Sequence, residues 1–129
     1  MKSLFFLVLL SFLSLFAQEP TFYYESGKKV HLDLLTNTLR ATKKVDYYEN
    51  EKGIVLGVSD KMLVKMVTTK NLAMLVKSLH LHLIKKFSSR LFLFQTPSKE
   101  QTLAIANSLY QRDDVVFAHP DFIKKHFKR

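Results

Sequence analysis

The histidines are the residues of this sequence with the widest chemical range, and they stand at His31, His80, His82, His119 and His126. His80 and His82 are two positions apart, so on a predicted strand both imidazoles would point to one face, where they could share a metal ion. A third ligand is not evident, because Cys, Asp and Glu are absent from the neighbouring sequence. The pattern favours a solvated strand edge, so we predict no metal and no other cofactor.

The other reactive residue types are poorly placed for catalysis. Nucleophilic catalysis needs a Ser or Cys beside a base and an orienting acid, but the chain has no Cys, and the serines at 88–89 fall in a predicted turn. A phosphate-cradling loop needs closely spaced glycines, whereas the three glycines are Gly27, Gly53 and Gly57. The adjacent carboxylates at 113–114 are typical of a helix end followed by a turn. We therefore expect no enzyme activity.

An apolar leader at residues 1–17 precedes the elements that must position any site. Lys2 gives it a charged start, a Leu/Phe/Val-rich run follows, and Ala17 stands before a polar stretch at 18–20. The run is shorter than the roughly 20 apolar residues of a membrane-spanning helix. This combination is typical of a secretory signal peptide cleaved after Ala17, with an uncleaved anchor as the alternative. We expect a secreted or periplasmic protein that does not span the membrane and, without Cys, has no disulfides.

Positive charge is the strongest bias of the composition, with 20 Lys and Arg against 11 Asp and Glu and a formal net charge of +9. The basic residues are scattered as pairs such as those at 28–29, 43–44 and 85–86, and the tail at 124–129 is basic too. A basic sheet with exposed aromatics could bind RNA, but the glycine–aromatic signature of such sheets is missing. Export also argues against nucleic acid as the partner, and an anionic cell surface remains open as an alternative.

Residues 18–58 predict an N-terminal extension made of β-hairpins. One hairpin pairs strands at 22–24 and 28–35 around Gly27, and a second pairs strands at 45–48 and 54–58 around Gly53. The polar stretch at 35–44 between them has no clear period.

Residues 59–123 alternate strand and helix patterns and predict one compact unit. Apolar residues at positions 72, 75, 76 and 79 recur at i, i+3, i+4 and i+7, as on one face of a helix, and Ser98 with Gln101 suggests a capping box for a second helix. The expected elements are a strand at 62–67, a helix at 72–79, strands at 81–87 and 91–94, a helix from Ser98 and a strand at 115–118. This order predicts an α+β fold with a ferredoxin-like split βαββαβ sheet and both helices on one face.

The predicted strands are apolar on both faces, although helices would cover only one face of the sheet. A partner protein, the 18–58 section or solvent must therefore meet the second face. The residues expected on this open face are Leu63, Phe92, Phe94 and Val116. A one-residue change of register exchanges the faces, and the open face would then carry Leu91, Leu93, Val115 and Phe117.

Residues 58–123 resemble the prodomains of subtilisin-like serine proteases, and the fervidolysin-like N-terminal prodomain is the most similar type. The stretch Met62-Leu63-Val64-Lys65-Met66 resembles the first strand of these prodomains, and residues 83–94 resemble their central hairpin. Residues 104–122 are similar to their second helix, last strand and exit, where Ala118-His119-Pro120-Asp121 is the most characteristic stretch. Residues 23–48 are similar more loosely.

The resemblance implies a protein that helps a protease to fold and then inhibits it. Its open sheet face would pack on two protease helices, and its exit, Asp121, Phe122, Ile123 and Lys124, would approach the substrate cleft. The catalytic Asp, His and Ser motifs of such a protease would be expected after Arg129, where the sequence ends. The expected partner is a subtilisin-like serine protease, supplied in trans or encoded downstream, unless the chain is the remnant of a split precursor. A basic module that binds the periplasmic or envelope surface without a protease partner is the alternative.

Overall fold

The computed structural model describes residues 21–35 and 44–124 of the chain. The predicted signal peptide at 1–17 and all but the first residue of the basic tail at 124–129 lie outside the described residues. Among the residues that are described, no helix has the length and apolar character needed to cross a membrane.

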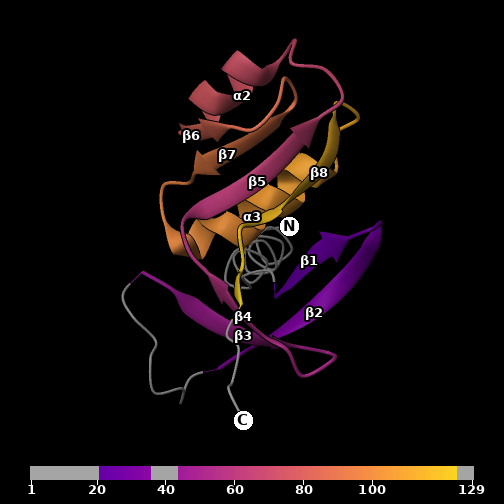
Figure 1. Ribbon diagram of the computed structural model, residues 1–129, viewed down its shortest axis with the longest axis vertical. Coiled ribbons are helices and arrows are strands. Elements are labelled where there is room, and N and C mark those ends of the chain that lie inside the picture. The colour runs from indigo at the N-terminus through magenta and orange to yellow at the C-terminus, as the bar shows by residue number, and fades with distance from the viewer. Residues whose placement is uncertain (1–20, 36–43, 125–129) are drawn as a thin grey trace, which may run out of the picture.

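The described residues fold into two sheets and two helices, which confirms the predicted α+β class (Figure 1). The elements in chain order are β1 (Phe22–Glu25), β2 (Lys28–Leu34), β3 (Asp46–Asn50), β4 (Val55–Val58), β5 (Lys61–Met66), α2 (Leu72–Ser78), β6 (His82–Lys86), β7 (Leu91–Gln95), α3 (Lys99–Tyr110), β8 (Val115–Pro120) and β9 (Ile123–Lys124).

The four N-terminal strands and the last strand of the chain form an antiparallel sheet in the order β1-β2-β3-β4-β9. The β1–β2 turn holds Ser26 and Gly27 at φ values of 49° and 80°, as in the two-residue turns whose twist matches that of paired strands. In the β3–β4 turn, the Asn50 side-chain oxygen accepts hydrogen bonds from the backbone N–H groups of Lys52 and Ile54. Both hairpins predicted from the sequence are present.

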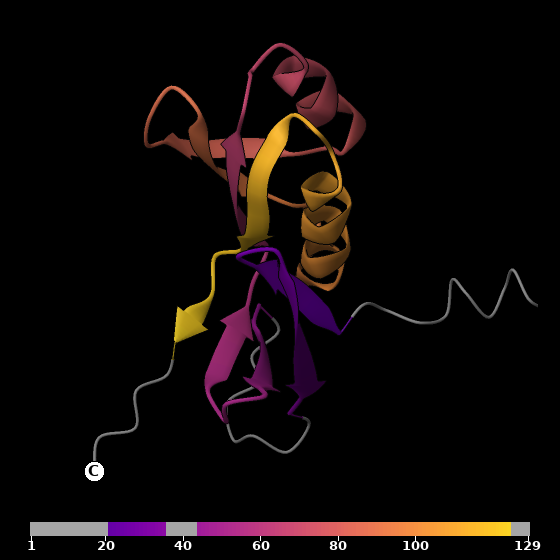
Figure 2. The ribbon, with the colours of Figure 1, turned by 90° about the vertical axis from the view of Figure 1, so that its right-hand side faces the viewer.

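The remaining strands form a second antiparallel sheet in the order β6-β7-β5-β8. Helices α2 and α3 both lie on one side of this sheet, and the five-stranded sheet lies at its end and not across its opposite side (Figure 2). We use the term open face for the side of the four-stranded sheet that faces away from α2 and α3.

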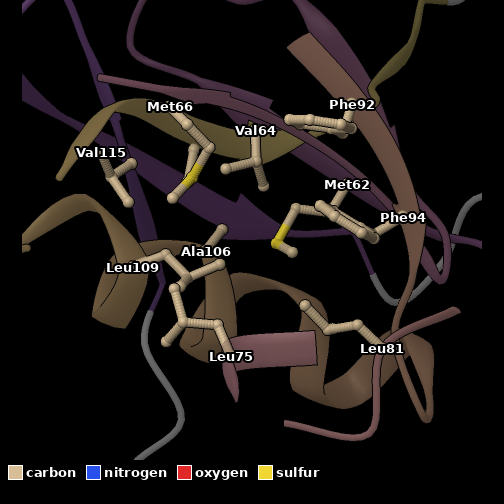
Figure 3. Close-up of a cluster of buried hydrophobic side chains, with 11 residues drawn as sticks. Met62, Val64, Met66, Leu75, Leu81, Phe92, Phe94, Ala106, Leu109 and Val115 are labelled. Carbon is tan, nitrogen blue, oxygen red and sulfur yellow. The ribbon is translucent and has the colours of Figure 1, made fainter. Parts of the chain in front are cut away.

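The main core lies between the four-stranded sheet and the two helices (Figure 3). Alternate residues of the strands point into it, as the two-residue period of a strand requires. Its buried members are Met62, Val64, Met66, Leu75, Leu81, Phe92, Phe94, Ala106, Leu109, Val115 and Ala118.

Helix α3 also contacts the five-stranded sheet, so it serves two cores. Its Leu103 belongs to a second buried cluster with Tyr23, Leu32, Tyr48, Leu56 and Val58. On the same helix, Asn107 donates a hydrogen bond from Nδ2 to the Phe22 carbonyl at 2.9 Å, and the Tyr110 ring stacks on Tyr24 with centroids 4.3 Å apart. An ion pair of 2.7 Å joins Lys99 at the start of α3 to Asp46 of β3.

The buried hydroxyl of Thr102 connects the ends of the two sheets through α3. Its Oγ1 donates to the carbonyl of Ser59, just after β4, at 2.8 Å and lies 2.8 Å from Oγ1 of Thr96, just after β7. Ser98 is the N-cap of α3 but makes no side-chain capping bond. The predicted capping box is therefore not formed, and only the Ser98 carbonyl accepts from the backbone N–H of Gln101.

Helix α2 ends in a hydrogen-bonded cap around His80. The N–H of His80 bonds to the Lys77 carbonyl and the N–H of Leu81 to the Val76 carbonyl, which is the Schellman pattern. His80 has a φ of 53°, a left-handed conformation that glycine adopts at far lower cost. The sequence favoured His80 and His82 on one strand face. This was wrong for His80, because the cap holds it in a turn before β6.

We expect His80→Gly to raise the free energy of unfolding by about 0.5–1 kcal/mol. Relief of left-handed strain outweighs the extra entropy that glycine gives the unfolded chain. Thermal and urea unfolding measure the effect. Lys77→Gly, inside α2, is the matched control and should cost about 1 kcal/mol. Equal destabilisation by both variants would contradict the role given to the His80 conformation.

We expect Thr102→Val to lower the free energy of unfolding by about 1–3 kcal/mol, because it leaves buried polar partners at Ser59 and Thr96 without their shared hydroxyl. Urea unfolding tests this, with the exposed Ser108→Ala on the same helix as control, expected within about 0.5 kcal/mol of wild type. Wild-type stability of the valine variant would show that the hydroxyl does not hold the sheets together.

Candidate functional site

The open face of the four-stranded sheet carries a row of apolar side chains that belongs to neither core. We call Leu63, Leu91, Leu93 and Phe117 the apolar stripe; all four are half-buried. They come from three adjacent strands, because Leu63 of β5 pairs with Leu93 of β7, and the next open-face residue of β5, Lys65, pairs with Leu91 of β7 and Phe117 of β8. The stripe therefore crosses the centre of the sheet.

The prediction that Phe92 and Phe94 lie on the open face was wrong. They point toward the helices, with 4% and 1% of their surface exposed, and their rings stack with centroids 5.8 Å apart. Because β7 is apolar on both faces, its sequence does not indicate which face the helices cover. Leu63 does lie on the open face, as expected.

A β-bulge explains why β8 fits neither predicted register. The pairing of β5 with β8 shifts between Lys65, opposite Phe117, and Met66, opposite Val115. A bulge sets two residues against one, so Val115 faces the core, Phe117 faces outward, and Val116 between them has no partner residue on β5. Val116 is 48% exposed and lies outside the stripe, so its predicted contact on the open face stays a prediction.

The predicted exit segment is docked on the chain's own five-stranded sheet. Ile123 pairs with Gly57 and Lys124 with Leu56, the ring of Phe122 lies 4.6 Å from that of Tyr23, and Asp121 donates its backbone N–H to the Lys61 carbonyl. Asp121, Phe122, Ile123 and Lys124 thus leave the last strand as expected but lie against β4, and their approach to a protease cleft stays a prediction. Pairing with β4 satisfies backbone groups that a sheet edge would leave unpaired.

An aromatic row links the open face to this docked segment. The ring of His119 stacks on Phe117 at 5.2 Å and on Phe122 at 6.3 Å between centroids, and its Nδ1 lies 2.9 Å from the Pro120 carbonyl oxygen. His119 is therefore a packing residue at the end of β8. Within the described parts of the chain, no three His, Cys, Asp or Glu side chains gather as a metal site would require.

The other residues considered for chemistry have structural partners. Ser88 accepts hydrogen bonds at Oγ from the backbone N–H groups of Arg90 and Leu91, so it shapes the β6–β7 turn. The Asp114 carboxylate accepts from Nε of Arg112 at 2.9 Å and from Asn71 at 3.3 Å, and the bond from Arg112 holds its pKa below the ordinary value.

Burial and the neighbouring Glu25 raise the pKa of Tyr23 to about 12, so the Tyr23 hydroxyl stays a hydrogen-bond donor at neutral pH. It donates to the Glu25 carboxylate at 3.2 Å.

Cations around the stripe were missed at the sequence level. Lys61 and Lys65 lie two residues before and two residues after Leu63 on β5, so their exposed side chains point to the open face as Leu63 does. Lys85 of β6 stands opposite Leu93. The signal was present in the alternation of Lys61-Met62-Leu63-Val64-Lys65.

Comparisons with protein-family models, with curated proteins and with solved structures find no match to this chain, so the resemblance of residues 58–123 stays a prediction.

Docking of β9 depends on the absence of a side chain at Gly57. A Cβ there would lie 2.9 Å from Cγ1 of Val45, 3.0 Å from Cε1 of Tyr47 and 3.1 Å from Cβ of Ile123. We expect Gly57→Ala to loosen the exit segment, which hydrogen exchange would detect as faster exchange at residues 121–124. Ile54→Ala, at an exposed site before β4, is the control and should leave this exchange unchanged. Slow exchange at residues 121–124 in both variants would show that β9 docking does not depend on the absence of a side chain at Gly57.

Proposed function

We propose that this chain binds a subtilisin-like serine protease through the open face of its four-stranded sheet, as a prodomain-like inhibitor or folding chaperone. The observation that carries the proposal is the apolar stripe, which neither α2 nor α3 covers. Four adjacent half-buried apolar side chains on one sheet face form the kind of patch that marks a protein–protein contact.

The arrangement of the elements supports the prodomain-like part of the proposal. The chain passes through β5, α2, β6, β7, α3 and β8 in turn, and the sheet order is β6-β7-β5-β8 with both helices on one side. This is the order expected of a ferredoxin-like split βαββαβ unit. The resemblance implies that such a unit places its uncovered sheet face on two helices of the protease.

The position of the five-stranded sheet favours a partner over internal coverage. The apolar residues of that sheet pack with Leu103 of α3 and with Phe122, in a cluster separate from the main core. A section that had evolved to cover the open face would instead contact the stripe. The open face is therefore available to a second protein.

The docked exit segment changes the expected mode of binding. Because β9 pairs with β4, residues 121–124 are held against the chain's own sheet, and we propose that the sheet face makes the principal contact. The protein has no catalytic role in this proposal and needs no cofactor. The leader at 1–17 is the basis for placing it in a secreted or periplasmic setting.

The test is complex formation between the purified protein and a purified subtilisin-like protease, measured by gel filtration and by slowed hydrolysis of a chromogenic peptide. Leu93→Asp should weaken both about tenfold or more, because docking would bury an unpaired carboxylate. Met74→Asp is the control: Met74 is on α2 and 56% exposed, so that variant should bind as wild type does.

Circular dichroism establishes that both variants are folded before they are compared. Rapid digestion of the wild-type protein without any complex would show that the proposed partner is wrong. Wild-type affinity in the folded Leu93→Asp variant would show that binding uses a different surface.

A further inference from the structure

One continuous part of the chain carries cations and no carboxylates. Residues 61–95, from β5 through β7, contain no Asp or Glu. The same stretch contains Lys61, Lys65, Lys70, Lys77, Lys85, Lys86 and Arg90. The positive charge of the protein is therefore concentrated in the strands that form the open face and in the helix that follows β5.

Three of these cations lie beside or between the residues of the apolar stripe, and Lys65 on the central strand stands between Leu91 and Phe117. Lys61 and Lys65 stand before and after Leu63 on β5, and all three share one face because strand residues two apart point the same way. Lys85 stands opposite Leu93 on the edge strand β6, with its Nζ 4.9 Å from the centre of the Phe87 ring. We call Lys61, Lys65 and Lys85 the basic rim.

The basic rim is not neutralised by the described residues of this chain. The ion pairs of the described structure use Lys99 and Arg112, which meet carboxylates of Asp46, Glu100 and Asp114 away from the open face. Asp60, next to Lys61 in sequence, accepts a hydrogen bond from Gln95 at 2.8 Å. Apolar side chains interspersed with cations that make no ion pair in the described structure fit a partner in which apolar side chains are interspersed with carboxylates.

We infer that the partner surface which docks on the open face is acidic, with carboxylates that pair with Lys61, Lys65 and Lys85 around an apolar ridge that meets the stripe. This inference rests on the proposed function and specifies the chemistry of the protease surface. The stripe supplies the affinity by burial, whereas the basic rim supplies the rate of association and the choice of partner, as complementary charges across an interface do.

A protein surface fits this face better than a lipid surface does. Segments that bind membranes insert protruding apolar side chains about 5–10 Å into the bilayer, but the residues of the stripe are half-buried in a sheet face between lysines. A convex ridge of side chains can reach them, and shape complementarity of this kind is usual at the centre of protein–protein interfaces.

The experiment measures the dissociation constant and the association rate with a purified subtilisin-like protease at low and high salt, from about 50 mM to about 500 mM NaCl. The test variant combines Lys61→Glu, Lys65→Glu and Lys85→Glu. The matched control combines Lys70→Glu, Lys77→Glu and Lys86→Glu, which change the net charge equally on the loop before α2, on α2 and on the helix side of β6.

The test variant should associate about tenfold or more slowly at low salt and lose the salt dependence that the wild-type protein shows. The control variant should keep most of the wild-type association rate at low salt and most of the wild-type salt dependence. If the wild-type protein binds and the two variants bind alike, the acidic-surface inference fails while the proposed function stands. If no form binds any protease, both fail together.

Vesicles of phosphatidylglycerol and phosphatidylcholine provide the second arm. We expect no co-sedimentation of the wild-type protein with them at about 150 mM NaCl, near the ionic strength where exposed charges are largely screened. Binding to these vesicles that the rim variant loses and the control keeps would overturn the inference and assign the basic rim to the cell envelope.

Discussion

Helix α3 is the element on which the rest of the structure depends, because it is buried on two sides. One side packs Ala106 and Leu109 against the four-stranded sheet, and the other presents Leu103 to the five-stranded sheet. The Thr102 hydroxyl on the same helix joins the ends of both sheets. Since the five-stranded sheet uses the second side of α3 for its own core, it lies at the end of the four-stranded sheet, and its described residues do not cover the open face.

Local patterns predicted where the strands and helices lie, but they could not predict which side of each strand is covered. Helix periodicity found α2 and α3, and glycine turns found both hairpins. In β7 every residue from Leu91 to Phe94 is apolar, so alternation gave no preference, and Phe92 and Phe94 were assigned to the wrong face. In β8 the bulge at Val116 breaks the two-residue period, so the alternation of residues could not predict which face each residue of β8 occupies.

The exit segment was unpredictable for a different reason, because its pairing is non-local and short. Two residues of β9 pair with β4, from which they are separated by the whole of the four-stranded unit. Neither Ile123 nor Lys124 carries a strand signal by itself. A glycine inside the otherwise apolar β4 was the available hint, since such a glycine often marks a close approach by another backbone, and Gly57 permits the approach of Ile123.

An uncovered apolar sheet face also has to avoid other copies of itself, and the basic rim provides a physical reason why it can. Two such faces would bring Lys61, Lys65 and Lys85 of each copy together, and like charges around a contact oppose it. A rim of neutral residues would leave the stripe free to self-associate, as exposed apolar sheet surfaces do. On the proposed function, the same three cations repel a second copy and attract an acidic partner, so one set of charges serves both the free and the bound protein.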